Sequence, residues 1–172
     1  GLDLLTFGHG VMLELSAVNA GIDLNIGDAD ATERLSRQLL LFIDGARILH
    51  YTGDKAAKER EVADALGEFD EQFVAPAAKR RRALLAARDA GEINEADVPR
   101  DVLRVLLENT EGLDLDPSTV LRETAFFLLT GASTSAAAMS STLHNIFGWI
   151  EIHPEDEVRL VNDATFVQRC IL

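Results

Sequence analysis

The chain has 172 residues, which favours a single domain spanning 1–172, and 47% of them are hydrophobic, enough to build a core. Its formal net charge of −13 disfavours nucleic acid as a partner, because such a chain repels phosphate backbones. The single cysteine excludes an internal disulfide and a cysteine-only zinc cluster, and it favours a cytoplasmic protein.

Two helices are predicted in the first third of the chain. The first covers residues 2–20, with Gly21 as its C-terminal cap. Its apolar side chains recur on one face: Leu4, Phe7, Val11, Leu15 and Val18. The second covers residues 31–51, and either Thr32 or Asp30 is suited to cap its first turn. Its apolar positions are Leu35, Leu39, Phe42, Ala46 and Leu49.

A third helix is predicted over residues 55–90, kinked or broken by Pro76. It contains the one basic run, residues 79–82, which is either a site for phosphate or an acidic partner or a solvated helix face. We favour the solvated face, because charge runs usually form one. A short helix over 98–109, starting near Pro99, follows with three side chains turned inward: Val102, Val105 and Leu106.

The chain is organised around one long helix, predicted over residues 116–153. Asp116 suits the N-cap and Pro117 the first helical position, whereas Pro154 prevents the helix from continuing past His153. Steps of three or four residues place these side chains on one face: Leu121, Ala125, Leu128, Ala132, Ser135, Met139, Leu143, Ile146 and Ile150.

The middle of this helix, residues 130–135, holds a glycine and four hydroxyl groups. One interpretation is a tight crossing, where small residues let another helix approach. The other is a helix that opens locally to admit a ligand. Another helix is predicted after Pro154 and a last amphipathic segment over 165–172. No strand pattern is present, so the fold class is all-α, and none of the four histidines has a recognised metal-binding spacing.

Two stretches resemble the central helix of cytochrome P450 monooxygenases. Thr130-Gly131-Ala132-Ser133-Thr134-Ser135 resembles the family's oxygen-binding motif, small-Gly-x-acid-Thr-Thr/Ser, and Ile152-His153-Pro154-Glu155 is similar to the end of that helix. The order of helices agrees as well. The resemblance implies a central fragment of a larger enzyme, from the E helix to the start of the K helix.

The resemblance also implies residue roles. Thr134 aligns with the threonine that hydrogen-bonds dioxygen and helps to deliver protons, and Gly131 with the residue that lets the backbone approach the haem. Three residues align with positions lining the substrate pocket: Phe126, Leu129 and Thr130. Thr130 and Thr134 also align with positions beside the haem. Ser133 stands where the family has an acid, and a hydroxyl relays a proton without supplying one.

The intact family uses haem, a small organic substrate and an electron-transfer partner. The isolated chain is predicted to be inactive, because the family's Glu-x-x-Arg motif and iron-ligating cysteine are missing. Cys170 cannot be that cysteine, because it lies before the place where the family has the Glu-x-x-Arg motif. No metal ligand is therefore assigned. The alternative hypotheses are a non-enzymatic helical interaction module and a small-molecule-binding module. A homo-oligomer, at least a dimer, is predicted to form through the apolar face of the long helix.

Overall fold

The structure, a computed structural model, describes the backbone of residues 3–25 and 27–171 and the side chains of residues 3–25 and 27–169. All secondary structure in this part of the chain is helical, which confirms the predicted all-α class. The α-helices are α1 (Leu4–Ala20), α2 (Ala29–Ala46), α3 (Lys55–Phe69), α4 (Ala75–Asp89), α5 (Val102–Glu108), α6 (Pro117–Ile152), α7 (Glu157–Asn162) and α8 (Ala164–Ile171).

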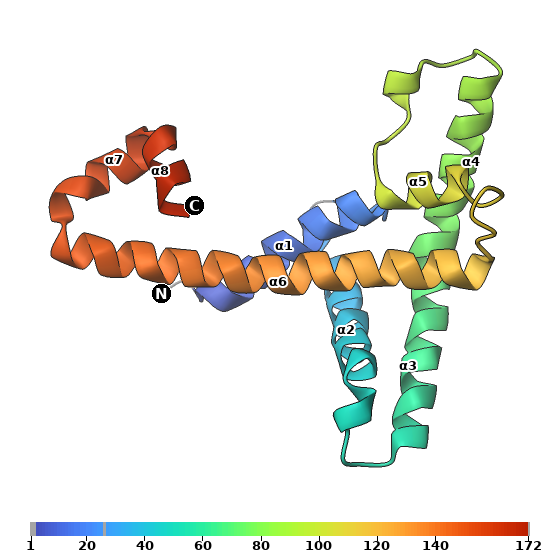
Figure 1. Ribbon diagram of the computed structural model, residues 1–172, viewed down its shortest axis with the longest axis horizontal. Helices are drawn as coiled ribbons and strands as arrows, with labels where there is room; N and C mark the ends of the chain where they lie inside the picture. The colour runs from blue at the N-terminus through green and yellow to red at the C-terminus, as the bar shows by residue number, and fades with distance from the viewer. Residues whose placement is uncertain (1–2, 26, 172) are drawn as a thin grey trace.

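The long helix α6 is the axis of the molecule (Figure 1). Helix α1 lies along its middle, and α2 and α3 form a hairpin that extends to one side. Helix α4 continues the line of α3 to the other side of α6, where α5 lies between α4 and the first turns of α6. Helices α7 and α8 fold back over the C-terminal end of α6.

Both predicted ends of the long helix are confirmed. The Asp116 carboxylate accepts hydrogen bonds from the Thr119 N–H at 2.9 Å and from the Thr119 hydroxyl at 3.1 Å, and Pro117 follows in the first turn. At the other end, His153 leaves helical geometry with φ −127° and ψ 66°, directly before Pro154. The 36 residues between them form one uninterrupted α-helix.

Helix α1 forms where predicted but buries a different face. Its buried side chains are mostly small ones, such as Ala17 and Ala20, whereas Phe7, Leu15 and Val18 are 48%, 50% and 47% exposed. The predicted face was therefore wrong. Apolar residues occupy most of the helix circumference, so periodicity alone does not select a face. The small residues allow the closest approach to α6 and are the ones that become buried.

The predicted kink or break at Pro76 is not present, but the α-helical pattern changes within the turn before it. Residues Asp70–Val74 form a π-helical turn between α3 and α4, in which the Ala75 N–H donates to the Asp70 carbonyl five residues back. Proline has no N–H with which to bond the carbonyl four residues before it. A wider turn at this point accommodates the missing donor and keeps the helical direction.

The predicted solvated face at residues 79–82 is wrong for one of its four members. Arg81 is 4% exposed, and its guanidinium donates to the Asp101 carboxylate at 2.9 and 3.1 Å and to the Asp23 carboxylate. Burial by itself would lower the pKa of Arg81, but the bonds to both carboxylates raise it above the ordinary value. This ion network joins α4 to the α1–α2 connection and to the start of α5.

The starts of α2 and α5 also differ from prediction. Asp28, rather than Thr32 or Asp30, caps α2 by accepting from the Ala31 N–H at 3.0 Å, and α2 ends at Ala46 instead of residue 51. A 3₁₀ turn follows and leaves Leu49 82% exposed. The caps of α2 and α5 are both aspartates, Asp28 and Asp101, and each carboxylate accepts from the backbone N–H three residues later.

Helix α5 begins later than predicted, after Asp101, which accepts from the Arg104 N–H at 2.8 Å. Its buried side chains are Leu103, Arg104 and Leu107. Of the predicted inward set, Leu106 is partly buried against the core and Val102 is half-buried, whereas the prediction was wrong for Val105. Val105 is 56% exposed. The buried ion pair between Asp101 and Arg81 holds the start of α5 in this rotation.

The hydrophobic core lies where α1, α2, α3, α4 and α5 meet the N-terminal half of α6. Ala136 is the last buried residue of α6 in the described part of the chain. The predicted apolar face is buried at Ala125, Leu128 and Ala132, whereas Ser135 is exposed. Within the described residues, no helix combines the length and the apolar character needed to cross a membrane.

Candidate functional site

The predicted motif lies at the middle of α6, where the helix has two opposite faces. Leu128 and Ala132 face the core and are 0% and 1% exposed. Steps of four residues advance about 40° around a helix, so Phe126, Thr130 and Thr134 form one stripe on the other side. We call these three residues the hydroxyl stripe. Phe126 is 56% exposed, and Thr134 is exposed as well.

Both threonines of the hydroxyl stripe hydrogen-bond the helix itself. The Thr130 hydroxyl donates to the Phe126 carbonyl at 2.9 Å, and the Thr134 hydroxyl donates to the Thr130 carbonyl at 2.5 Å. Each hydroxyl has one proton, which these bonds use. The oxygen lone pairs remain available, so Thr134 can accept a hydrogen bond as it stands and must change rotamer to donate one to a ligand.

Gly131 lies where α1 crosses α6. A Cβ added to Gly131 would come within 2.9 Å of the Ser16 Oγ and 3.3 Å of the Ser16 Cβ. At a second point of this crossing, a Cβ on Gly8 would lie 2.8 Å from the Met139 Cε. The interpretation as a tight crossing is therefore confirmed, and the helix is not opened at residues 130–135. The role of Gly131 towards a haem stays a prediction.

Ser133 and Leu129 lie on the flank between the two faces. The Ser133 Oγ is buried and has no hydrogen-bond partner among the described residues. Leu129 packs against the core cluster, so it does not share the open surface of Phe126. The two residues predicted as catalytic thus have different surroundings, with Thr134 in the open and the Ser133 hydroxyl enclosed.

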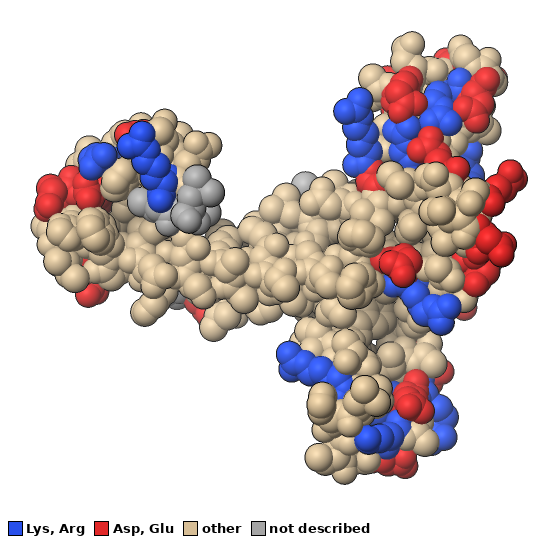
Figure 2. All heavy atoms as spheres, viewed as in Figure 1, with Lys and Arg blue, Asp and Glu red and all other residues tan. Residues whose placement is uncertain are grey.

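The exposed side of α6 carries no ionised side chain over most of its length. Residues 124–150 contain no Asp, Glu, Lys or Arg. Figure 2 shows the consequence, a bar without acidic or basic residues between two lobes that carry the charges. A helix facing water along one side ordinarily has charged residues there. This face is therefore suited to contact an apolar partner or group.

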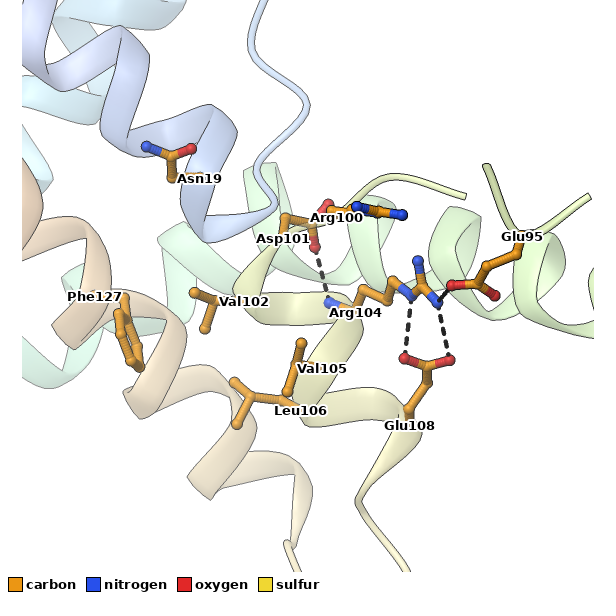
Figure 3. Close-up of a pocket in the computed structure, with 10 residues that line it drawn as sticks. All are labelled: Asn19, Glu95, Arg100, Asp101, Val102, Arg104, Val105, Leu106, Glu108 and Phe127. Carbon is orange, nitrogen blue, oxygen red and sulfur yellow. Dashed lines mark hydrogen bonds and ion pairs between the residues drawn. The ribbon is translucent and has the colours of Figure 1, made fainter. Parts of the chain in front are cut away.

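A second hollow, which the sequence did not predict, lies beside α5 (Figure 3). It measures about 670 Å³, and Phe127 of α6 contributes to its apolar wall. At its rim, Arg104 bonds Glu108 at 3.1 Å and also pairs with Glu95. Hydrogen bonds from Arg88 and Arg104 lower the pKa of Glu108 below its ordinary value. The wall comes from four separate stretches of sequence, so no local pattern marks it.

This hollow adjoins a smaller one of about 160 Å³ at the α1–α6 crossing. Thr130 and Gly131 line the smaller hollow together with Ser16. Both hollows include Asn19, Val102 and Phe127 in their walls, so they form one continuous depression, which we call the α5 groove.

The histidines and acidic residues of the described part of the chain do not gather into a metal site. Within the described part of the chain, no three His, Cys, Asp or Glu side chains form a group that could hold a metal ion. His153 stacks on Trp149 with 3.9 Å between ring centroids, which fits its predicted place at a helix boundary. The side chain of Cys170 lies outside those described.

Comparison with known proteins does not assign this chain to a family. Searches against family models, curated proteins and solved structures found no match to this chain.

Proposed function

We propose that this chain is the oxygen- and substrate-binding helical core of a haem-thiolate monooxygenase of the cytochrome P450 kind. The observation that carries the proposal is the hydroxyl stripe, which lies exposed at the centre of a long helix whose open side has no charged residue from 124 to 150. An uncharged face with a few hydroxyl groups suits a flat apolar cofactor and an organic substrate.

The residues present fit one side of a haem. Thr130 and Thr134 would lie against its face, and Phe126 would extend the apolar surface towards a substrate. Haem, when bound, supplies the activation of dioxygen. By the resemblance, the loop with the iron-ligating cysteine would lie beyond residue 172, so these 172 residues would hold the group without its thiolate.

The side chains of this chain would orient the substrate and handle protons. The Thr134 oxygen accepts a hydrogen bond in its present rotamer, and breaking the 2.5 Å bond to the Thr130 carbonyl would free its proton for donation. Ser133 is the neighbouring hydroxyl, and its buried Oγ has no described partner. Because a serine has no acidic proton to supply, we expect proton delivery to be weaker than with a carboxylic acid at this position.

A titration with hemin tests the proposal on the chain as it exists. Wild-type protein should bind hemin in a saturable way, followed by the Soret absorbance. Thr130→Trp places a large ring on the hydroxyl stripe and should weaken binding at least about tenfold, or about 1.4 kcal/mol. Val161→Trp, at a position 80% exposed on α7, adds the same ring elsewhere and should leave binding unchanged.

Equal hemin affinities for wild type and Thr130→Trp would overturn the proposal. The reduced hemin complex with carbon monoxide gives a separate check of the missing thiolate. We expect no thiolate-type carbon monoxide band from these 172 residues, and observing that band would contradict the assignment as a central fragment.

A second function is favoured by α1. This helix has Glu14 as its single Asp, Glu, Lys or Arg, yet three of its large apolar side chains are about half exposed: Phe7, Leu15 and Val18. A helix that is apolar all round is ordinarily buried. We therefore keep a helical module that self-associates as the alternative to the enzyme fragment.

A further inference from the structure

The α5 groove combines an apolar wall with unpaired polar groups at both ends. Its wall consists of Val102, Val105, Leu106 and Phe127, which gather between α5 and α6 in Figure 3. Phe127 is 47% exposed and Val105 56% exposed, although both lie beside other apolar side chains. A hollow of this size and lining is of the kind that takes a small organic molecule.

One end of the groove offers neutral hydrogen-bonding groups. Ser16 is only 8% exposed, and its hydroxyl makes no hydrogen bond with any described residue. The Asn19 amide, which lies between the two hollows, makes none within the described residues either. Buried polar groups are ordinarily hydrogen-bonded, so Ser16 has capacity for a ligand atom.

The other end offers one guanidinium group without a partner among the described residues, that of Arg100. The Arg104 guanidinium is occupied by Glu95, Glu108 and the Val98 carbonyl, and Asp101 is occupied by Arg81. Arg100 lies on the rim, exposed, and forms no ion pair or hydrogen bond through its side chain with the described residues. Each carboxylate at the rim thus has an arginine partner, whereas the Arg100 side chain has none among the described residues.

From these contacts we propose that the α5 groove binds an amphipathic organic monocarboxylate. The carboxylate pairs with Arg100, the hydrocarbon or aromatic part covers Phe127 and Val102, and a polar substituent reaches Ser16 and Asn19. A guanidinium matches a carboxylate in a two-bond geometry. A single carboxylate can pair with Arg100, whereas the second charge of a dianion would face the surrounding carboxylates of Glu95, Glu108 and Asp101. This site meets the hydroxyl stripe only at Thr130 and does not depend on haem.

Decanoate and decanol are suitable probes, because they differ mainly in the charged head. Calorimetric titration of the full chain should show saturable binding of decanoate, with decanol at least about tenfold weaker. Arg100→Gln should reduce decanoate affinity to the level of decanol and leave decanol unchanged. Phe127→Ala should weaken both ligands, whereas Phe147→Ala, at a phenylalanine of α6 that is 51% exposed outside the groove, should affect neither.

Circular dichroism of each variant reports whether it keeps the helical fold. The Arg100→Gln test removes no buried contact, so it remains decisive if Phe127→Ala unfolds. The proposal is wrong if Arg100→Gln keeps wild-type decanoate affinity, or if Phe147→Ala weakens binding as much as Phe127→Ala does. It is also wrong if decanoate shows no saturable binding below its micelle concentration.

Discussion

Gly21 has a backbone conformation that other residues adopt only with strain. It ends α1 with φ 94°, and the N–H groups of Gly21 and Ile22 both donate to the Ala17 carbonyl. There is also no room for a side chain, because an added Cβ would lie 2.6 Å from the Leu103 Cβ and 2.6 Å from an Asp101 carboxylate oxygen. One glycine therefore fixes both the end of α1 and its distance from α5.

Gly21→Ala should accordingly lower the free energy of unfolding by about 1–2 kcal/mol for the left-handed conformation. The overlap with α5 should add about 1–3 kcal/mol. Gly10→Ala is the matched control, since Gly10 is helical and nothing lies within 4 Å of an added Cβ. It should raise stability by up to about 1 kcal/mol. Urea denaturation followed by circular dichroism measures both, and similar effects of the two substitutions would contradict this account.

Asp116, the N-cap of α6, makes the stability of the fold depend on pH. Hydrogen bonds from the Ser118 side chain and from the Thr119 N–H and hydroxyl lower its pKa from 3.8 to about 2. A carboxyl whose pKa is lower in the folded state stabilises the fold above its unfolded pKa. That contribution is lost as the pH falls from 3.8 to about 2.

Asp116→Asn keeps a good N-cap without a group that titrates. We expect wild type to lose stability relative to Asp116→Asn between pH 4 and pH 2, and the difference to be constant above about pH 5. Glu95 and Glu108 also have lowered pKa values, and they contribute equally to both proteins. Parallel stability curves for the two proteins over the whole range would show that Asp116 does not act in this way.

Two helices, α1 and α6, approach closely because small residues meet at their crossing. Ser16 and Gly131 form one contact, and Gly8 lies against Met139 at the other. Because glycine and serine have few or no side-chain atoms at these points, the helix axes lie close together, and ridges of one helix fit the grooves of the other. The crossing places α1 directly beside the residues of the predicted motif.

Gly131→Ala tests this crossing. Alanine favours a helix over glycine by about 1 kcal/mol, but its Cβ would overlap Ser16 at a cost of about 1–3 kcal/mol. We expect a net loss of roughly 1 kcal/mol in unfolding free energy. Gly148→Ala, in the same helix with nothing within 4 Å, should instead stabilise the protein. A combined Ser16→Gly/Gly131→Ala variant should show favourable coupling, and additive effects would argue against the contact.

The whole molecule exposes more surface than a compact chain of its mass. Its accessible area is 11,076 Å². A compact monomer of 18.7 kDa exposes roughly 8,300 Å². The excess of roughly 2,800 Å² per chain is more than the about 1,200–2,000 Å² that a standard interface buries in total. Much of the excess is apolar, including the outer side of α1 and the charge-free side of α6.

We therefore expect the purified chain to form a dimer or a larger oligomer. The predicted contact through Leu128 needs correction, because Leu128 is 0% exposed within its own chain. The outer side of α1 is available instead. Phe7→Lys/Leu15→Lys should weaken self-association at least about tenfold in sedimentation at micromolar concentration, because it places charges in the contact.

Val158→Lys/Val161→Lys adds the same charge at positions 68% and 80% exposed on α7 and serves as the control. It should leave self-association unchanged. A wild-type monomer at micromolar concentration, or equal effects of both double variants, would contradict an interface through α1.

The end of α1 and both ends of α6 could be predicted from local sequence alone. Asp116, Pro117, Gly21 and Pro154 act on neighbouring backbone groups, so their effects are local and can be predicted. The motif at 130–135 was correctly located in the long helix, and its tight-crossing interpretation followed from the small residues alone.

Which faces and which charges are buried depends instead on how distant elements pack together. Helix α1 is apolar nearly all round, so its buried side depends on how closely each face can approach α6. Arg81 finds Asp23 and Asp101 far away in sequence, and the α5 groove takes its wall from several segments. These contacts arise from the packing of distant elements, and no period or cap within one segment carries that information.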